Sequence, residues 1–379
     1  MVEWKKLGDL LDYEQPTSYL VNSTEYDESY DVPVLTAGQS LLLGYTNETE
    51  GIYQASKANP TIIFDDFTTS FHWIDYKFKV KSSAMKMLRP KKDVNFRYVY
   101  YAMLGINFVP GGHQRHWISK YSNLEIPIPS LSEQQRIVSI LDTFTSSISN
   151  LKQQIEERRK QYEYEREMLL DLEGKEGVEM KKLGEVCEIK GRIGFRGYTK
   201  EDQVAKGEGA LTLTATNIVN QRIDYSNNTY VTWKKYNESP EIMVKNGDII
   251  ICQRGSIGKI AIVENLREEA TINPQLLLLK NFSCNNKYLN YYLLSRWFHD
   301  KLKTIVGYGT IQMIAQKDLK NLSIPSIDEE AQSRIVSILD TFEQSIANLE
   351  EQLAMREKQY EYYRNQLLTF EGEEERGKT

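Results

Sequence analysis

The sequence has few cysteines and no long apolar run, and each shortage excludes a class of protein. The 379 residues contain three cysteines, Cys187, Cys252 and Cys284, which are too far apart for a cysteine zinc site or a disulfide framework. A membrane helix needs about 20 apolar residues, but the longest such run spans seven, from Tyr98 to Leu104. The opening MVEWKKLGDL lacks the apolar segment of a secretory signal. These shortages favour the reducing cytoplasm and no membrane partner.

Motifs of catalytic and nucleotide-binding proteins are also missing. The segment GSIGKI at 255–260 has the wrong spacing for a phosphate-binding loop, and neither GxGxxG nor HExxH occurs. His113 and His116 form one isolated pair, which is a weak basis for a metal site. Asp65 and Asp66 follow an apolar strand, where adjacent side chains point to opposite faces, so we expect them to cap a turn. The (Asp/Asn)-Pro-Pro-aromatic signature of amino-methyltransferases is absent. The sequence therefore predicts a chain with no catalytic residue, metal or cofactor of its own.

An internal repeat is the main feature that the sequence does contain. RIVSILDTF stands at 136–144 and again at 334–342, and KQYEY at 160–164 and 358–362, both at an offset of 198 residues. The tetrapeptide KKLG near the start of each half recurs at an offset of only 176. Similar segments thus flank two regions of different length and sequence, which predicts a shared framework carrying two different domains.

Both repeated segments are predicted to be long helices. From Ile137 and from Ile335, apolar and aromatic residues recur every three or four positions, the pattern of a coiled-coil seam. Arg158 and Arg356 interrupt the two seams at the same place. About 41 residues at 1.5 Å each give a rod of roughly 60 Å. A homodimeric zipper is one interpretation of such a helix, but two seams in one chain favour pairing with each other.

The charge is unevenly distributed along the chain. The net charge is −6, yet residues 77–120 hold ten Lys or Arg and one acid, Asp93. Residues 183–320 have nineteen basic and fourteen acidic residues, a net of +5. One basic run is more often an ordinary solvated face, but two runs in corresponding regions favour nucleic-acid binding.

Internal alignment and residue type give a set of candidate DNA contacts. An offset of 191 places Ser82-Ser83-Ala84 opposite Asn273-Pro274-Gln275 and Tyr100-Tyr101 opposite Tyr291-Tyr292, and an offset of 198 places Gln114 opposite Gln312. The segment 247–259 is predicted to form a turn, a buried strand and a polar glycine loop, whose amide and guanidinium groups suit base edges. A plain β-hairpin explains that segment equally well. The candidate contacts are Lys79, Lys81, Ser82, Ser83, Gln114, Arg115, Arg192, Arg196, Gln253, Arg254, Ser256, Lys259 and Gln312.

Two junctions carry a resemblance to a known family. IPIPSLSEQQRIV and NLSIPSIDEEAQSRIV each lead into a repeated helix, and the chain resembles the specificity (S) subunits of type I restriction–modification enzymes over essentially its whole length. The resemblance implies an α+β fold, in which two mixed α/β target recognition domains are separated by two long helices that form an antiparallel coiled coil with a pseudo-twofold repeat. The expected boundaries are domain 1 at 1–129, helix at 130–174, domain 2 at 175–327, helix at 328–373 and a tail at 374–379.

The resemblance also implies a function and partners. Each domain would read one half of a bipartite site in double-stranded DNA, and the coiled coil would set the spacing. Two methyltransferase (M) subunits, which use S-adenosylmethionine, and restriction (R) subunits, which use ATP and magnesium, would assemble on a non-catalytic chain. The alternative is a stand-alone coiled-coil DNA-binding regulatory protein without modification partners.

Overall fold

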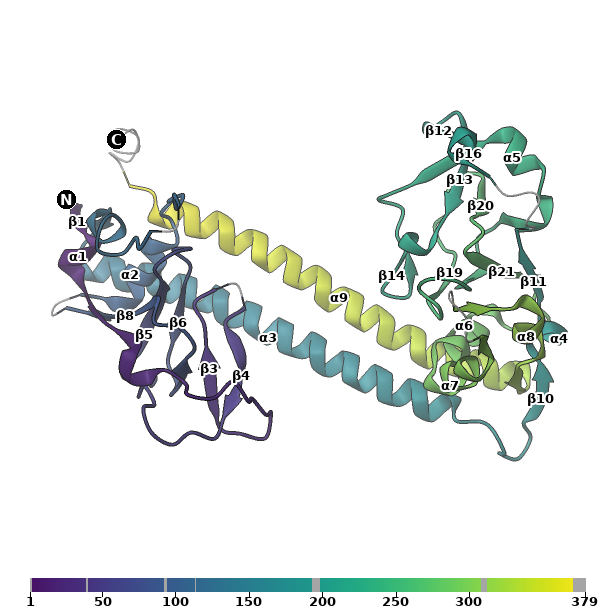
Figure 1. Ribbon diagram of the computed structural model, residues 1–379, viewed down its shortest axis with the longest axis horizontal. Coiled ribbons are helices and arrows are strands. Elements are labelled where there is room, and N and C mark those ends of the chain that lie inside the picture. Colours follow the sequence, from purple (N-terminus) through teal and green to yellow (C-terminus); the bar gives the residue numbers. More distant parts are fainter. Residues whose placement is uncertain are drawn as a thin grey trace. The chain divides into compact units, whose positions relative to one another are not determined.

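The computed structural model describes residues 2–38, 40–91, 94–112, 114–192, 198–307 and 312–370. The described residues fall into two compact units. Unit 1 takes those of Met1–Lys152 and Glu351–Thr379, and unit 2 those of Gln153–Glu350. Each unit holds one globular domain and part of two long helices, α3 (Leu131–Leu170) and α9 (Glu329–Leu368) (Figure 1). No helix within these ranges is long and apolar enough to span a membrane.

The domain of unit 1 is built from two small sheets and a strand pair. Its strands are β1 (Glu3–Lys6), β2 (Leu11–Glu14), β3 (Val32–Leu35), β4 (Leu42–Thr46), β5 (Thr61–Asp65), β6 (Phe71–Ile74), β7 (Lys79–Val80), β8 (Met85–Pro90) and β9 (Glu125–Ile128). Its short helices are α1 (Leu7–Leu10), α2 (Phe96–Met103) and the 3-10 helices η1 (Pro16–Tyr19) and η2 (Tyr121–Asn123). The strand orders are β2-β8-β5-β6, β4-β3-β7 and β1-β9.

The domain of unit 2 has more and shorter elements. Its strands are β10 (Glu179–Lys182), β11 (Glu188–Gly191), β12 (Gln203–Val204), β13 (Gly209–Leu213), β14 (Ile218–Val219), β15 (Arg222–Ile223), β16 (Thr229–Thr232), β17 (Met243–Val244), β18 (Ile249–Cys252), β19 (Ile260–Ile262), β20 (Ala270–Ile272), β21 (Leu276–Lys280), β22 (Val306–Gly307), β23 (Met313–Ile314) and β24 (Ser323–Ser326). Its helices are α4 (Leu183–Val186), α5 (Trp233–Asn237), α6 (Asn286–Leu294), α7 (Arg296–Ile305), α8 (Gln316–Asn321), η4 (Lys200–Asp202), η5 (Ala215–Asn217) and η6 (Pro240–Ile242).

The two domains share their strand topology. The antiparallel order β2-β8-β5-β6 of unit 1 is matched by β11-β21-β18-β19 of unit 2. In the second sheet of each unit, β3 and β13 pair with one neighbour in parallel (β7, β20) and with another antiparallel (β4, β16). Unit 2 adds β12 and β17 at the edges of this sheet. The repeat therefore extends into the regions whose sequences differ.

The central strand of each domain is buried on both faces. In β18, Ile249 and Ile251 belong to the core beside α6, and Ile250 and Cys252 belong to the core between the two sheets. In β5, the alternating residues divide between two cores in the same way. A strand covered on both faces needs a continuous apolar run, which is what IIIC and TIIF provide.

The two long helices pair antiparallel within each unit. In unit 1, Phe144 of α3 stacks on Tyr363 of α9, with ring centroids 5.3 Å apart. In unit 2, Tyr162 of α3 lies 6.3 Å from Phe342 of α9. In both units, residue numbers increase along α3 as they decrease along α9. The arginines that interrupt the seams cover aromatic rings: the Arg356 guanidinium lies 5.7 Å from the centre of the Phe144 ring, and that of Arg158 lies 5.8 Å from Phe342.

An aspartate of the repeated RIVSILDTF segment anchors each domain to a long helix. In unit 1, the Tyr101 hydroxyl donates to Asp142 at 2.5 Å. In unit 2, the Tyr291 hydroxyl donates to Asp340 at 2.6 Å. Burial, reinforced by these hydrogen bonds, raises the pKa of both tyrosines, so each hydroxyl stays a donor. The same anchor is thus formed twice.

These anchors correct the helix alignment expected from the sequence. Tyr101 is equivalent to Tyr291, at an offset of 190 rather than 191. The strands that precede the helices do keep 191, since Arg89 pairs with Asp12 in the same register as Lys280 with Glu188. One residue is therefore lost between strand and helix in unit 2, where sequence comparison alone has no marker for it.

Candidate nucleic-acid interface

In unit 1, three polar segments meet at Asp66, the residue that follows β5. The Asp66 N–H donates to the Ala84 carbonyl at 2.9 Å, which holds the segment after β7. The Asp66 carbonyl accepts the His116 N–H at 2.8 Å, which holds the segment before η2. We call this arrangement the unit 1 clamp (residues 66, 82–84 and 114–117).

In unit 2, Gln253 after β18 makes the same two backbone contacts. Its N–H donates to the Gln275 carbonyl at 2.9 Å, and its carbonyl accepts the Ile314 N–H at 3.0 Å. The residues held are those that the offsets of 191 and 198 place opposite Ala84 and His116. We call this arrangement the unit 2 clamp (residues 253–256, 273–275 and 312–314).

The two clamps have one backbone plan and different side chains. Ser82 is replaced by Asn273, Ser83 by Pro274 and Arg115 by Met313. Gln114 and Gln312 are the same residue, and both are exposed. A fixed backbone that presents variable polar side chains can offer different donors and acceptors to a ligand, which is what sequence readout on DNA needs.

The Asp66 side chain makes the unit 1 clamp rigid. Its carboxylate pairs with Lys86 at 2.9 Å, and both side chains are 1% exposed. The same carboxylate accepts the Trp117 N–H at 2.9 Å. His116 beside it is buried among aromatic residues, with its ring 5.5 Å from that of Phe108. Asp65 caps the turn after β5, as expected, by accepting N–H groups of the next residues, whereas Asp66 has this separate, buried role.

Most candidates in unit 1 lie on this clamp. Ser82 and Ser83 belong to one of its segments, Gln114 and Arg115 to another, and Lys81 immediately precedes the first. Lys81, Ser83, Gln114 and Arg115 are exposed, while the half-buried Ser82 hydroxyl accepts the Ala84 N–H at 3.1 Å. The structure therefore brings together two candidate stretches that are 31 residues apart in sequence.

Lys79 does not belong to this surface. Its side chain is 3% exposed, and the ammonium group pairs with Glu48 at 3.0 Å and donates to the Glu50 carbonyl at 2.7 Å. Although burial alone would raise the pKa of Glu48, hydrogen bonds from Lys79 and from two backbone N–H groups hold it below its usual value. Lys79 is a structural cation, contrary to the expectation from the sequence.

Four candidates in unit 2 lie on or beside its clamp. The exposed Arg254 lies next to Met313, with its Nε 2.8 Å from the sulfur, and the exposed Gln312 is the next residue along. The Gln253 amide donates to the Pro274 carbonyl at 3.0 Å, so one of its two donors is engaged within the clamp. Ser256 is exposed in the glycine loop.

The three remaining candidates of unit 2 are placed differently. Lys259 is exposed, and its ammonium group donates to the Ile218 carbonyl at 3.3 Å, which braces the far end of the glycine loop. Arg192 is buried and donates to the Thr271 hydroxyl at 3.1 Å, so it is structural rather than available to a ligand. Arg196 lies outside the described residues.

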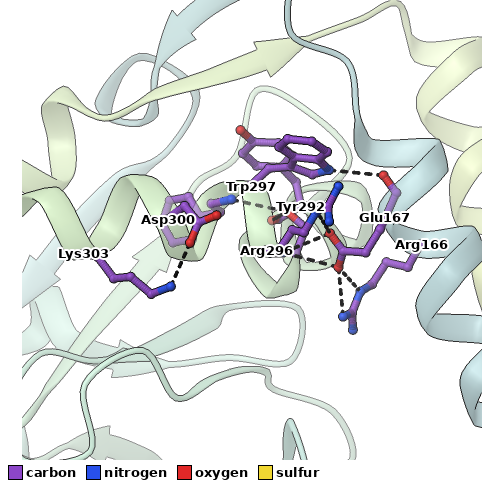
Figure 2. A network of polar contacts seen from close by, with 9 residues as sticks. Arg166, Glu167, Tyr292, Arg296, Trp297, Asp300 and Lys303 are labelled. Atoms are coloured by element: carbon purple, nitrogen blue, oxygen red, sulfur yellow. Dashed lines mark hydrogen bonds and ion pairs between the residues drawn. The ribbon is translucent and has the colours of Figure 1, made fainter.

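Helix α7 packs against the glycine loop of the unit 2 clamp. The His299 ring lies against Gly258, where an added Cβ would come within 3.2 Å of the ring, and the φ of +81° there favours glycine. Figure 2 shows how α7 is fixed to the C-terminal part of α3. The Glu167 carboxylate accepts the Arg296 N–H at 3.1 Å, and the Glu167 carbonyl accepts the Trp297 indole N–H at 3.2 Å. This helix and its glutamate were not singled out from the sequence.

Within the described ranges, no three His, Cys, Asp or Glu side chains come together as metal ligands. His113 lies outside those ranges. All three cysteines are free, and burial raises the pKa of each thiol, most strongly at Cys187, to about 12.

Comparison with known proteins shows which family has this architecture. Residues 1–158 and 175–355 match the family described as type I restriction modification DNA specificity domain. The chain is 39% identical to the specificity subunit of the Escherichia coli type I restriction enzyme EcoR124I/EcoR124II, covering 97% of this chain and 94% of that protein. It is 30% identical to a putative type I specificity subunit of Haemophilus influenzae, covering 97% and 96%.

A solved structure agrees at the level of fold. The crystal structure of a type I restriction–modification S subunit from M. genitalium covers 98% of this chain and 96% of its own length, at a TM-score of 0.63 and 16% identity. The α+β fold class with two domains and two long helices is thereby confirmed. The family resemblance drawn from the two junctions is confirmed as well, and the chain belongs to the family of type I restriction–modification DNA specificity subunits.

Proposed function

We propose that the two clamps are the DNA-reading surfaces, each specific for one half of a bipartite site. The observation that supports this most strongly is that one backbone arrangement occurs in both units with different exposed side chains. A common backbone would dock the two domains on DNA in the same way, while the side chains at positions such as Arg115 and Met313 would select different bases.

We also propose that the long helices set the gap between the half-sites. Each domain is anchored to its helix by the same Tyr–Asp hydrogen bond, at Asp142 and at Asp340. The aspartate of each anchor lies in the repeated segment and the tyrosine in the domain, so another domain that carries this tyrosine would attach in the same way. The distance between the clamps would then depend on the helices rather than on the bases that are read.

The partners that fit are two methyltransferase subunits, joined by restriction subunits where the host encodes them. Tyr164 and Tyr362 stand at equivalent positions of α3 and α9, and they are 64% and 61% exposed. Exposed aromatic residues are typical of binding surfaces, and two equivalent ones suit two copies of the same partner. S-adenosylmethionine, ATP and magnesium would be bound by those partners, in the cytoplasm, and this chain would be non-catalytic.

Reconstitution tests this function. The purified chain alone should not methylate DNA, and adding the methyltransferase subunit encoded beside it should give adenine methylation by a complex with two methyltransferases per chain, measured by native mass spectrometry. Sequencing of the methylated DNA should return two half-sites with a constant gap. Methyl transfer by the chain alone, once shown to be free of partner, would contradict the proposal. Sequence-specific binding with no methyltransferase association would instead support the stand-alone regulator.

A further inference from the structure

The seam between the long helices does not by itself select which helices pair. In unit 1, the ring centroids of Phe144 of α3 and Tyr360 of α9 are 6.5 Å apart. In unit 2, those of Tyr162 of α3 and Phe342 of α9 are 6.3 Å apart. At the offset of 198, Phe144 corresponds to Phe342 and Tyr162 to Tyr360, so this is one contact made twice. An α3 helix would meet a second α3 through the same aromatic rings.

Two ion pairs beside the seam do distinguish the helices. In unit 1, the Lys152 ammonium lies 2.9 Å from the Glu357 carboxylate. In unit 2, the Arg159 guanidinium lies 2.5 Å from the Glu350 carboxylate. At the offset of 198, position 152 corresponds to 350 and position 159 to 357, so the two pairs are also one contact made twice. In both of them the base stands on α3 and the acid on α9.

Pairing of like helices would bring like charges together at these positions. With the same geometry, two α3 helices from two copies of the chain would place Lys152 opposite Arg159, and two α9 helices would place Glu350 opposite Glu357. On each helix the two positions lie seven residues apart, and each directly follows a seam residue. Such flanking positions set partner choice in coiled coils.

We propose that these two ion pairs make the helix pairing heterotypic: they favour α3 with α9 and oppose pairing of α3 with α3, or α9 with α9, from a second copy of the chain. The consequence goes beyond DNA reading. During folding, when several copies have exposed seams, the charges would prevent assemblies in which like helices pair, and so keep two different domains on every helix pair. Exposed charges act through solvent, so the preference should weaken as salt rises.

A double charge exchange separates this preference from helix stability. In the variant Lys152→Glu, Glu357→Lys, both intramolecular ion pairs persist with one of them reversed. Pairing of like helices, however, becomes attractive, because the new carboxylate at position 152 would face Arg159 and the new ammonium at position 357 would face Glu350. Mixed 14N and 15N full-length chains are unfolded in denaturant and refolded together at low salt. We expect a dimer fraction about fivefold above that of the natural chain, measured by light scattering.

A carbodiimide crosslink identifies which helices have paired. This reagent joins a carboxylate to a contacting lysine, so a mixed-isotope crosslink between positions 350 and 357 reports α9 against α9. The matched control is Glu156→Lys, Lys160→Glu, which exchanges a solvent-exposed ion pair made within α3 itself, and it should behave as the natural chain does. Equal dimer fractions in the double exchange and the control, or extra dimer without the 350–357 crosslink, would overturn the proposal.

Discussion

Asp66 and Gln253 hold the same backbone contacts, but only Asp66 adds a buried charge to them. Its carboxylate and Lys86 are both almost fully buried, 2.9 Å apart. Removing one member of a buried pair leaves the other charge without compensation, which costs about 3–5 kcal/mol. The unit 1 clamp therefore depends on a pair that the unit 2 clamp does without.

Asp66→Ala should accordingly lower the free energy of unfolding of unit 1 by about 3–5 kcal/mol, measured by denaturant unfolding of the full chain. Adding Lys86→Met to this variant should recover part of the loss, since no unpaired charge then remains. Gln253→Ala serves as the control, because it removes a neutral hydrogen bond worth about 1 kcal/mol. A loss of less than about 1 kcal/mol in Asp66→Ala would show that Lys86 reaches water in the folded chain.

Arg254 is the exposed cation best placed for base contact in the unit 2 clamp. Arg254→Ala should cost about 1–3 kcal/mol at one base pair of the second half-site and relax the preference there. The measurement is binding of the methyltransferase complex to a library of second half-site variants. Arg267→Ala, at another exposed arginine of unit 2, should leave the profile unchanged. Equal weakening across the whole library would mean that Arg254 contacts phosphate or protein.

Residue type identified the polar segments, but it could not show which cations are buried. Lys79 meets Glu48 across 31 residues of sequence, and the burial of Arg192 depends on strand β20, so neither can be judged from local pattern. The equivalence of Asp66 and Gln253 cannot be seen from residue type, because the two differ in type and stand at an offset of 187. Their shared position directly after a buried apolar strand was the available signal.

Helix α7 makes the stability of unit 2 depend on pH through one side chain, His299. Burial lowers the pKa of His299, and the positive charges of Arg166 and Lys303 lower it further. The unfolded chain, with a histidine pKa of about 6.5, then binds more protons than the folded one as the pH falls below that value. The contribution of His299 to the stability of unit 2 is fully present above this pH and is lost as the pH falls from the ordinary pKa through the lowered one.

His299→Gln should flatten this dependence. We expect the loss of unfolding free energy between about pH 7.5 and about pH 5.5 to be smaller in the variant than in the natural chain, by denaturant unfolding at each pH. His72→Gln in unit 1, where the ring lies 2.9 Å from the Gly38 carbonyl, controls for loss of a histidine. If both variants keep the full decline, carboxylates rather than His299 cause it.

At the level of elements, periodicity predicted the long helices because a seam of eleven positions is a strong local signal. The structure has them at Leu131–Leu170 and Glu329–Leu368, within the ranges 130–174 and 328–373 expected from the sequence. The small strands of unit 2, several of them two residues long, carry no such signal, and they form only through pairing with distant segments.

For the whole molecule, the repeat explains how one chain can carry two specificities. The framework is the part that recurs: the strand pairs β1-β9 and β10-β24, the Tyr–Asp anchors and the helix seam. The clamps recur in backbone but not in side chains. Each domain should therefore be exchangeable as a unit, since its attachment does not depend on what it reads.

Exchange of one domain tests this central claim most directly. Residues 7–122 would be replaced by the first domain of another family member, and DNA modified by the resulting complex with its methyltransferase would be sequenced for methylated sites. We predict that the first half-site changes to that of the donor, while the second half-site and the gap between them stay as they are in the natural complex. A change in both half-sites, or in the gap, would contradict the independence of the two domains.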